Sequence, residues 1–205
     1  MEERELISEN SKNSNLAKST KEWFALIICH FVGCILVWLL TPRDVLNYVC
    51  VREMTDYIAG YMPLIALIGK YAPKPIIEFI AVCELFISLG SAIWATILCV
   101  KYFEISLKRT MMLENFRKKI LTHLVYEPVI AGMFWVFLFY SPKQHLAHYN
   151  VNIGWRMWGF MGSEVGIVFI GGALFLVLFL IPVLFLNGYC IDIMILTRKI
   201  TDRRK

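Results

Sequence analysis

Long runs of apolar residues, separated by shorter polar segments, dominate the 205-residue chain. A run of about 18 or more mostly apolar residues is long enough to cross a bilayer as a helix. We therefore predict an all-α, polytopic membrane protein built as a four-transmembrane-helix bundle. Its spans are expected at about 23–40, 75–100, 120–140 and 165–186.

The polar stretches divide the chain into a membrane domain and two tails. Residues 1–22 are polar and poor in aromatic residues, which indicates a mobile N-terminal tail. Residues 23–196 form the predicted membrane domain, and residues 197–205 form a basic C-terminal tail.

One apolar segment, 57–69, is too short to cross a bilayer and is interrupted by Gly60 and Pro63. Two interpretations remain open for it. It can lie as a short helix at the membrane interface, or it can re-enter the membrane without crossing.

The composition agrees with a chain that faces lipid over much of its surface. Hydrophobic residues make up 58% of the chain, charged residues 18%, and the mean hydropathy is +0.60. A soluble domain contains roughly 45–50% apolar residues. Basic residues gather beside the apolar runs, above all at 101–119, where we expect contact with anionic lipid headgroups. This distribution does not indicate nucleic-acid binding.

The positions of the basic residues predict the orientation. With four spans, fifteen Lys and Arg residues lie in the two tails and the middle loop, whereas six lie in the other two loops. Loops rich in Lys and Arg stay in the cytoplasm. We therefore expect both termini to be cytoplasmic, in a bacterial inner membrane or a plasma membrane.

Ionisable residues inside the predicted spans are the first candidate site. Such residues are costly in lipid and usually face other helices. Similar depths in the bundle would allow a polar seam that comprises Glu84, Glu127, His30 and His123. The seam can be a set of hydrogen bonds that fixes the helix register, or it can line a proton or cation path. Glu78 is expected as an ordinary carboxylate at the outer interface.

Small residues indicate where helices approach each other closely. Glycines permit close backbone packing in membranes, and GxxxG is one such pattern. The candidate helix-packing residues are Gly162, Gly166, Gly171 and Gly172.

Motifs for catalysis and metal binding are weak. The chain has no GxSxG, no HExxH and no glycine-rich phosphate loop. His145 and His148 are three residues apart, but Glu164 is the nearest further ligand type downstream in that loop. The six cysteines form no CxxC pair and are interpreted as unpaired structural residues. We predict no catalytic, cofactor or metal site.

These observations favour a non-enzymatic membrane protein that binds another membrane protein or an incoming polypeptide. In topology alone, the layout resembles small bacterial inner-membrane immunity or exclusion proteins, such as those that protect against pore-forming colicins. Besides the lipid bilayer, the expected partners are another membrane protein or further copies of the chain. The alternative is a small proton- or cation-linked transporter or channel subunit that uses Glu84 and Glu127.

Overall fold

The computed structural model describes residues 2–72, 74–111, 129, 132 and 163–203, and within them every regular element is a helix. This confirms the predicted all-α class for the described part of the chain. The elements in chain order are α1 (Glu2–Leu40), η1 (Val45–Asn47), α2 (Val49–Tyr61), α3 (Pro63–Tyr71), α4 (Ile76–Lys101), α5 (Phe103–Met111), α10 (Glu164–Gly166), η4 (Ile167–Gly171) and α11 (Gly172–Arg203).

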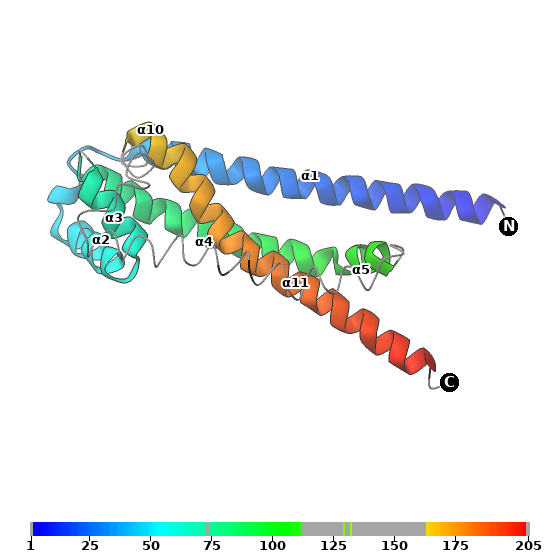
Figure 1. Cartoon of the computed structure of the whole chain (residues 1–205). Coiled ribbons are helices and arrows are strands. Elements are labelled where there is room, and N and C mark those ends of the chain that lie inside the picture. The colour runs from blue at the N-terminus through cyan, green and yellow to red at the C-terminus, as the bar shows by residue number, and fades with distance from the viewer. Residues whose placement is uncertain (1, 73, 112–128, 130–131, 133–162, 204–205) are drawn as a thin grey trace.

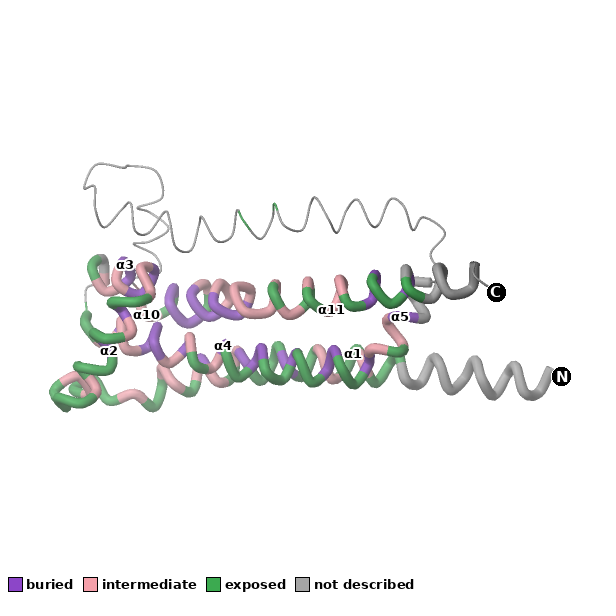
Figure 2. Tube along the Cα trace, turned by 90° about the horizontal axis from the view of Figure 1, so that it is seen from below, coloured by how far each residue is buried: buried purple, intermediate pink, exposed green. Residues whose placement is uncertain are grey.

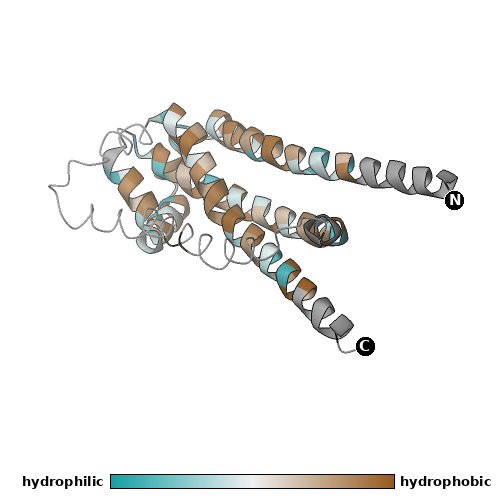
Figure 3. Ribbon diagram, turned by 45° about the vertical axis from the view of Figure 1, so that its right-hand side comes forward, coloured by the Kyte–Doolittle hydropathy of each residue, from teal (hydrophilic) through white to brown (hydrophobic). Residues whose placement is uncertain are grey.

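Among the described residues, three helical stretches are long and apolar enough to cross a membrane. They are Leu16–Leu40, Ile76–Lys101 and Glu164–Ile195. Multi-pass membrane insertion is thus supported by helix length and composition. Figure 3 shows this most clearly for α1 and α11, whose ribbons are largely brown, the hydrophobic colour. The predicted span at 120–140 lies outside the described residues.

The three long helices run side by side (Figure 1). Helix α1 is antiparallel to α4, and α11 is parallel to α4. Leu107 of α5 packs against Ile191 and Ile195 near the far end of α11. The two termini and α5 therefore share one end of the bundle, and α2, α3 and α10 share the other.

Two helices are longer than the sequence pattern indicates. Helix α1 begins at Glu2, within the segment that was expected to be a mobile tail. No proline precedes Pro42, so none interrupts the helix before the end of the first span. Helix α11 continues through Asn187 and Gly188, where an end was expected. A glycine inside a helix costs only about 1 kcal/mol. The packing of the last turns of α11 against α5 outweighs that cost.

Helices α2 and α3 follow each other at one end of the bundle, separated by a single non-helical residue. The break falls at Met62, whose backbone is extended (φ −113°, ψ 92°), and Pro63 begins α3. An extended residue before a proline at the first helical position is the usual geometry. The apolar segment 57–69 thus joins the end of α2 to most of α3.

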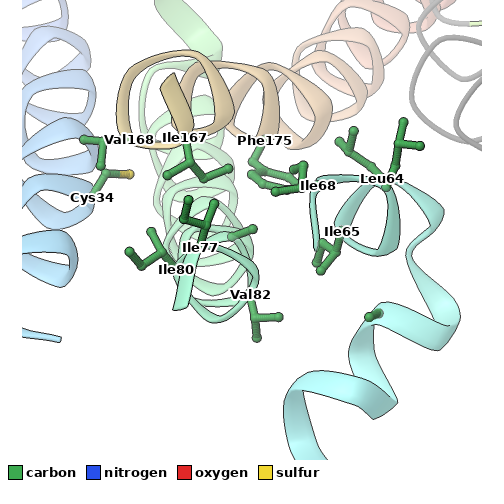
Figure 4. Packing of buried hydrophobic residues seen from close by; sticks show 13 residues of the cluster. Cys34, Leu64, Ile65, Ile68, Ile77, Ile80, Val82, Ile167, Val168 and Phe175 are labelled. Atoms are coloured by element: carbon green, nitrogen blue, oxygen red, sulfur yellow. The ribbon is translucent and has the colours of Figure 1, made fainter. Parts of the chain in front are cut away.

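Helix α3 belongs to the main hydrophobic core. Four of its side chains have exposed fractions of 0–1%: Leu64, Ile65, Leu67 and Ile68. All four belong to one cluster with Ile77 and Ile80 of α4, Ile167 of η4 and Phe175 of α11. Figure 4 shows three of them, Leu64, Ile65 and Ile68, in this cluster. Because lipid is itself apolar, close van der Waals packing rather than escape from water holds such contacts together.

The buried face of α4 positions the candidate site. Residues at alternating spacings of four and three face the core, as in a coiled coil. In chain order they are Ile77, Ala81, Glu84, Ser88, Ser91, Ala95 and Leu98. The three central positions are polar, and the flanking ones are apolar. Figure 2 shows buried positions alternating with exposed ones along α4 and α1, whose tubes overlap in that view.

Candidate functional site

A buried histidine joins the three long helices. His30 of α1 is 1% exposed. Its Nδ1 lies 3.1 Å from Ser91 Oγ of α4, and its Nε2 lies 3.0 Å from the carbonyl oxygen of Gly172 in α11. Interhelical hydrogen bonds of this kind contribute about 0.6 kcal/mol on average in membranes. These two contacts link α1 to α4 and to α11, and at this magnitude they add little to the stability of the bundle.

Glu84 lies in the same stripe of α4, seven residues before Ser91. It is 0% exposed, and neither carboxyl oxygen has a hydrogen-bond partner among the described residues. The hydroxyl of Ser88, one turn further along α4, also lacks a partner there. An unpaired buried polar group is costly. The described core holds one other such atom, the hydroxyl oxygen of Tyr102.

The glycine pair of α11 makes room for these side chains. A Cβ on Gly171 would lie 3.0 Å from Glu84 Oε2 and 2.6 Å from Ile167 Cδ1. A Cβ on Gly172 would lie 3.1 Å from Cys34 Sγ and 3.8 Å from His30 Nε2. Both positions therefore lie where a larger residue would displace a polar side chain.

A π-helical turn, η4, comes directly before Gly172. The Gly172 N–H bonds to the carbonyl oxygen of Ile167, five residues earlier. Single π-turns of this kind are frequent at functional sites because they shift the register of the helix. Here the glycine pair lies at the end of the turn, with Gly171 next to Glu84 and Gly172 next to Cys34.

An ion pair lies near each end of the bundle. At the end with the termini, Lys101 Nζ lies 2.7 Å from both carboxyl oxygens of Glu22. At the other end, Lys74 pairs with Glu164, which also accepts a hydrogen bond from the Trp38 indole at 3.4 Å. Lys74 and Lys101 are about 40 Å apart along α4, close to a bilayer thickness that includes the headgroups.

A cavity of about 460 Å³ opens beside the Lys74–Glu164 pair. Its lining includes two basic and two acidic side chains, Arg43, Lys74, Asp44 and Glu164, together with the apolar side chains of Ile76 and Ile80. This volume is in the range of small-ligand pockets. Glu164 already has two partners here, and η1 and the ends of α1 and α4 form the rest of the wall.

Several sequence-predicted residues lie outside the described part of the chain. They are Glu127, His123, Gly162, His145 and His148. The structure therefore describes only the His30 and Glu84 part of the predicted seam. Gly166 is buried, and its N–H bonds to Ser163 Oγ at 3.0 Å, which caps α10. Glu78 lies against α3, where a Cβ on Gly69 would meet its carboxyl carbon at 2.5 Å.

Sequence reasoning missed the two serines, Ser88 and Ser91, that lie on the buried face of α4 with Glu84. Ser88 and Ser91 follow Glu84 by four and seven residues, so the heptad spacing could have placed them on its face. No local sequence pattern predicts the ion pairs at the two ends of the bundle. Glu22 and Lys101, like Lys74 and Glu164, are far apart in the chain.

The described residues contain no group of three His, Cys, Asp or Glu side chains that could hold a metal ion. All six cysteines are free; Cys34 and Cys99 are buried. No family model, no curated protein and no solved structure matches the chain in comparisons with known proteins.

Proposed function

We propose that the protein is a four-span integral membrane protein with both termini in the cytoplasm. The described chain leaves the bundle through α5 at one end and resumes at α10 at the other. A crossing between Met111 and Ser163 would connect these ends, and the apolar run 120–140 is long enough to make it. The excess of Lys and Arg at the end with the termini supports a cytoplasmic location for that end.

We further propose that the protein acts by binding another membrane protein or an incoming polypeptide, as accessory, immunity or exclusion proteins do. The outward face of α2 carries this proposal. Thr55 and Ala59 are buried and hold one face of the helix against the bundle. Tyr57 and Tyr61 are 66% and 70% exposed on the other, with their ring centroids 4.9 Å apart.

The charges on α2 keep this face out of hydrocarbon and suggest the chemistry of the partner. Glu53 and Asp56 are exposed beside the two tyrosines, and burying such carboxylates in lipid would be costly. Arg52 is directed toward η1, where its Nε donates to the Leu46 carbonyl oxygen at 3.2 Å. Acidic and tyrosine-rich surfaces suit a polypeptide segment that carries basic and apolar residues.

Photo-crosslinking in native membranes tests this proposal. A crosslinking amino acid at Tyr57 or Tyr61 should give a discrete heavier adduct with a second protein. The double variant Glu53→Gln, Asp56→Asn should reduce that adduct several-fold, because charge complementarity is lost.

Ile97 of α4 provides the matched control. It is 59% exposed on a helix in the apolar part of the bundle, where we expect lipid. The same crosslinker at Ile97 should give no discrete protein adduct. Lipid adducts or self-adducts alone at Tyr57 and Tyr61 would reject the proposal.

The burial of Glu84 favours a second candidate, proton- or cation-linked transport. A carboxyl with 0% exposure and no partner among the described residues is the kind of group that transporters use as a relay. Ion flux through the pure protein in proteoliposomes, abolished by Glu84→Gln, would support transport. No flux through the wild-type protein would exclude it.

A further inference from the structure

The hydrogen bonds of His30 determine which ring nitrogen carries a proton. Nε2 lies 3.0 Å from the Gly172 carbonyl oxygen, which can only accept. Nε2 therefore donates, and the neutral ring is the Nε2–H tautomer. The Cys34 sulfur lies further from Nε2, at 3.7 Å, and makes at most a weak contact. The other nitrogen, Nδ1, is the atom whose protonation can change.

Ser91 faces Nδ1 and has two possible partners for its one hydroxyl proton. Its Oγ lies 3.1 Å from His30 Nδ1 and 3.0 Å from the carbonyl oxygen of Ile87. With a neutral ring, the Ser91 hydroxyl donates to Nδ1. With a protonated ring, Nδ1–H donates to Ser91 Oγ, and the hydroxyl turns to the Ile87 carbonyl.

Each ring state is therefore fully hydrogen-bonded in the same arrangement of heavy atoms. The Ile87 carbonyl oxygen also accepts the helical N–H bond of residue 91, so it has a partner in either state. Only the hydroxyl rotor of Ser91 has to turn. We propose that His30, Ser91 and the Gly172 carbonyl form a reversible proton-binding site inside the membrane domain.

Few ionisable groups of the described chain lie near this site. Glu84 lies about 10 Å from Ser91 along α4 and has no described partner. The Ser88 hydroxyl, which also has no described partner, lies between Glu84 and Ser91 on the same face of α4. Residues 167–188 of η4 and α11 contain no ionisable side chain. The Glu22–Lys101 pair is about 12 Å from His30 along α1. Among the described residues, Cys34 is a further ionisable neighbour, with its Sγ 3.7 Å from His30 Nε2.

Proton binding at His30 requires neither partner binding nor ion flux. The competing possibility is that His30 stays neutral and serves only to fix helix register. Solid-state ¹⁵N NMR of the full chain, labelled at histidine and placed in lipid bilayers, separates the two. The chain has four histidines, so the His30 signals are assigned by their loss in His30→Gln.

We expect the Nε2–H tautomer at high pH and a reversible change to the doubly protonated ring on acidification between about pH 8 and 5. Ser91→Ala removes the acceptor for Nδ1–H, so at a given pH the protonated fraction relative to the neutral form should fall about three- to tenfold. Ser91→Thr keeps a hydroxyl and should restore it.

Ser88→Ala is the matched control, because its hydroxyl has no described partner and its loss should leave the His30 spectrum unchanged. A neutral ring that persists to about pH 5 would overturn the proposal. So would an Nδ1–H tautomer in the neutral state, or equal spectra for Ser91→Ala and wild type. The wild-type titration decides the question by itself if Ser91→Ala fails to fold.

Discussion

The carbonyl oxygen of Gly172 accepts a hydrogen bond from His30 Nε2 at 3.0 Å, and this contact joins α11 to α1 inside the bundle. It lies in the first turn after the π-helical segment η4. The absence of a side chain at Gly172 lets Cys34 and His30 approach the backbone. The hydrogen bond from His30 thus forms at a position without a side chain, where a Cβ would lie 3.1 Å from Cys34 Sγ.

The glycine pair should be sensitive to added volume. Gly171→Ala places a Cβ 2.6 Å from Ile167 Cδ1 and 3.0 Å from Glu84 Oε2, so both buried side chains have to move. We expect a loss of about 1–2 kcal/mol in the free energy of unfolding. Equilibrium unfolding in mixed detergent micelles measures it.

Gly90→Ala is the matched control on α4. A Cβ there meets nothing within 4 Å, and alanine favours the helix. Its free energy of unfolding should equal or exceed that of the wild type. An equal loss in both variants would mean that the close approach at Gly171 is not the cause.

Replacing Glu84 by methionine should stabilise the fold. The carboxyl is fully buried without a described partner, and removing an unsatisfied polar group recovers about 1–3 kcal/mol. Glu84→Gln keeps shape and polarity and should change the free energy of unfolding by less than about 1 kcal/mol. Strong destabilisation by both changes would show that Glu84 is ionised and paired with a cation.

The charged contacts at the two ends should contribute little. Both ion pairs are partly exposed. The side chains of Lys101 and Glu22 are 46% and 27% exposed, and those of Lys74 and Glu164 are 53% and 31% exposed. Surface ion pairs contribute little because water and salt screen them. Glu22→Gln and Glu164→Gln should therefore leave the denaturant midpoint of unfolding almost unchanged. A large fall of the midpoint in either variant would mean that the pair stabilises its end of the bundle.

Labelling in intact cells should report the orientation. Cys50 is exposed at the start of α2 and Thr197 is exposed near the end of α11. In single-cysteine variants, a membrane-impermeant maleimide should label Cys50 from outside and Thr197→Cys only after permeabilisation. The reverse pattern would invert the proposed topology.

The sequence predicts the long helices well and their partners poorly. The span expected at 75–100 closely matches α4, because helix length and hydropathy are local properties. The contact between His30 and Ser91 joins residues 61 positions apart, and no local pattern encodes it. The break at Met62 was foreseeable from Pro63, whereas the continuation of α11 past Gly188 depends on its packing against α5.

The candidate site was predictable only as a set of unusual residue types. An ionisable residue in an apolar run signals a buried role, and His30 and Glu84 are both buried. Which atoms bond to them depends on the rotation of each helix, and the π-turn at η4 changes that rotation for α11. A π-turn has no clear sequence signature here, so the approach of Gly172 to His30 required the structure.

Helix α1 packs against α11 at the glycine pair, and an engineered disulfide can probe this contact. A Cβ on Gly172 would lie 3.7 Å from the Cβ of Cys34, within the range of about 3.5–4.5 Å found in disulfides. Gly172→Cys, with the other five native cysteines replaced by alanine, should form an oxidised Cys34–172 link that mass spectrometry detects after digestion. Gly90→Cys in the same background should not. Two free thiols in the Gly172→Cys variant after oxidation would show that α1 and α11 do not approach each other at Cys34 and Gly172.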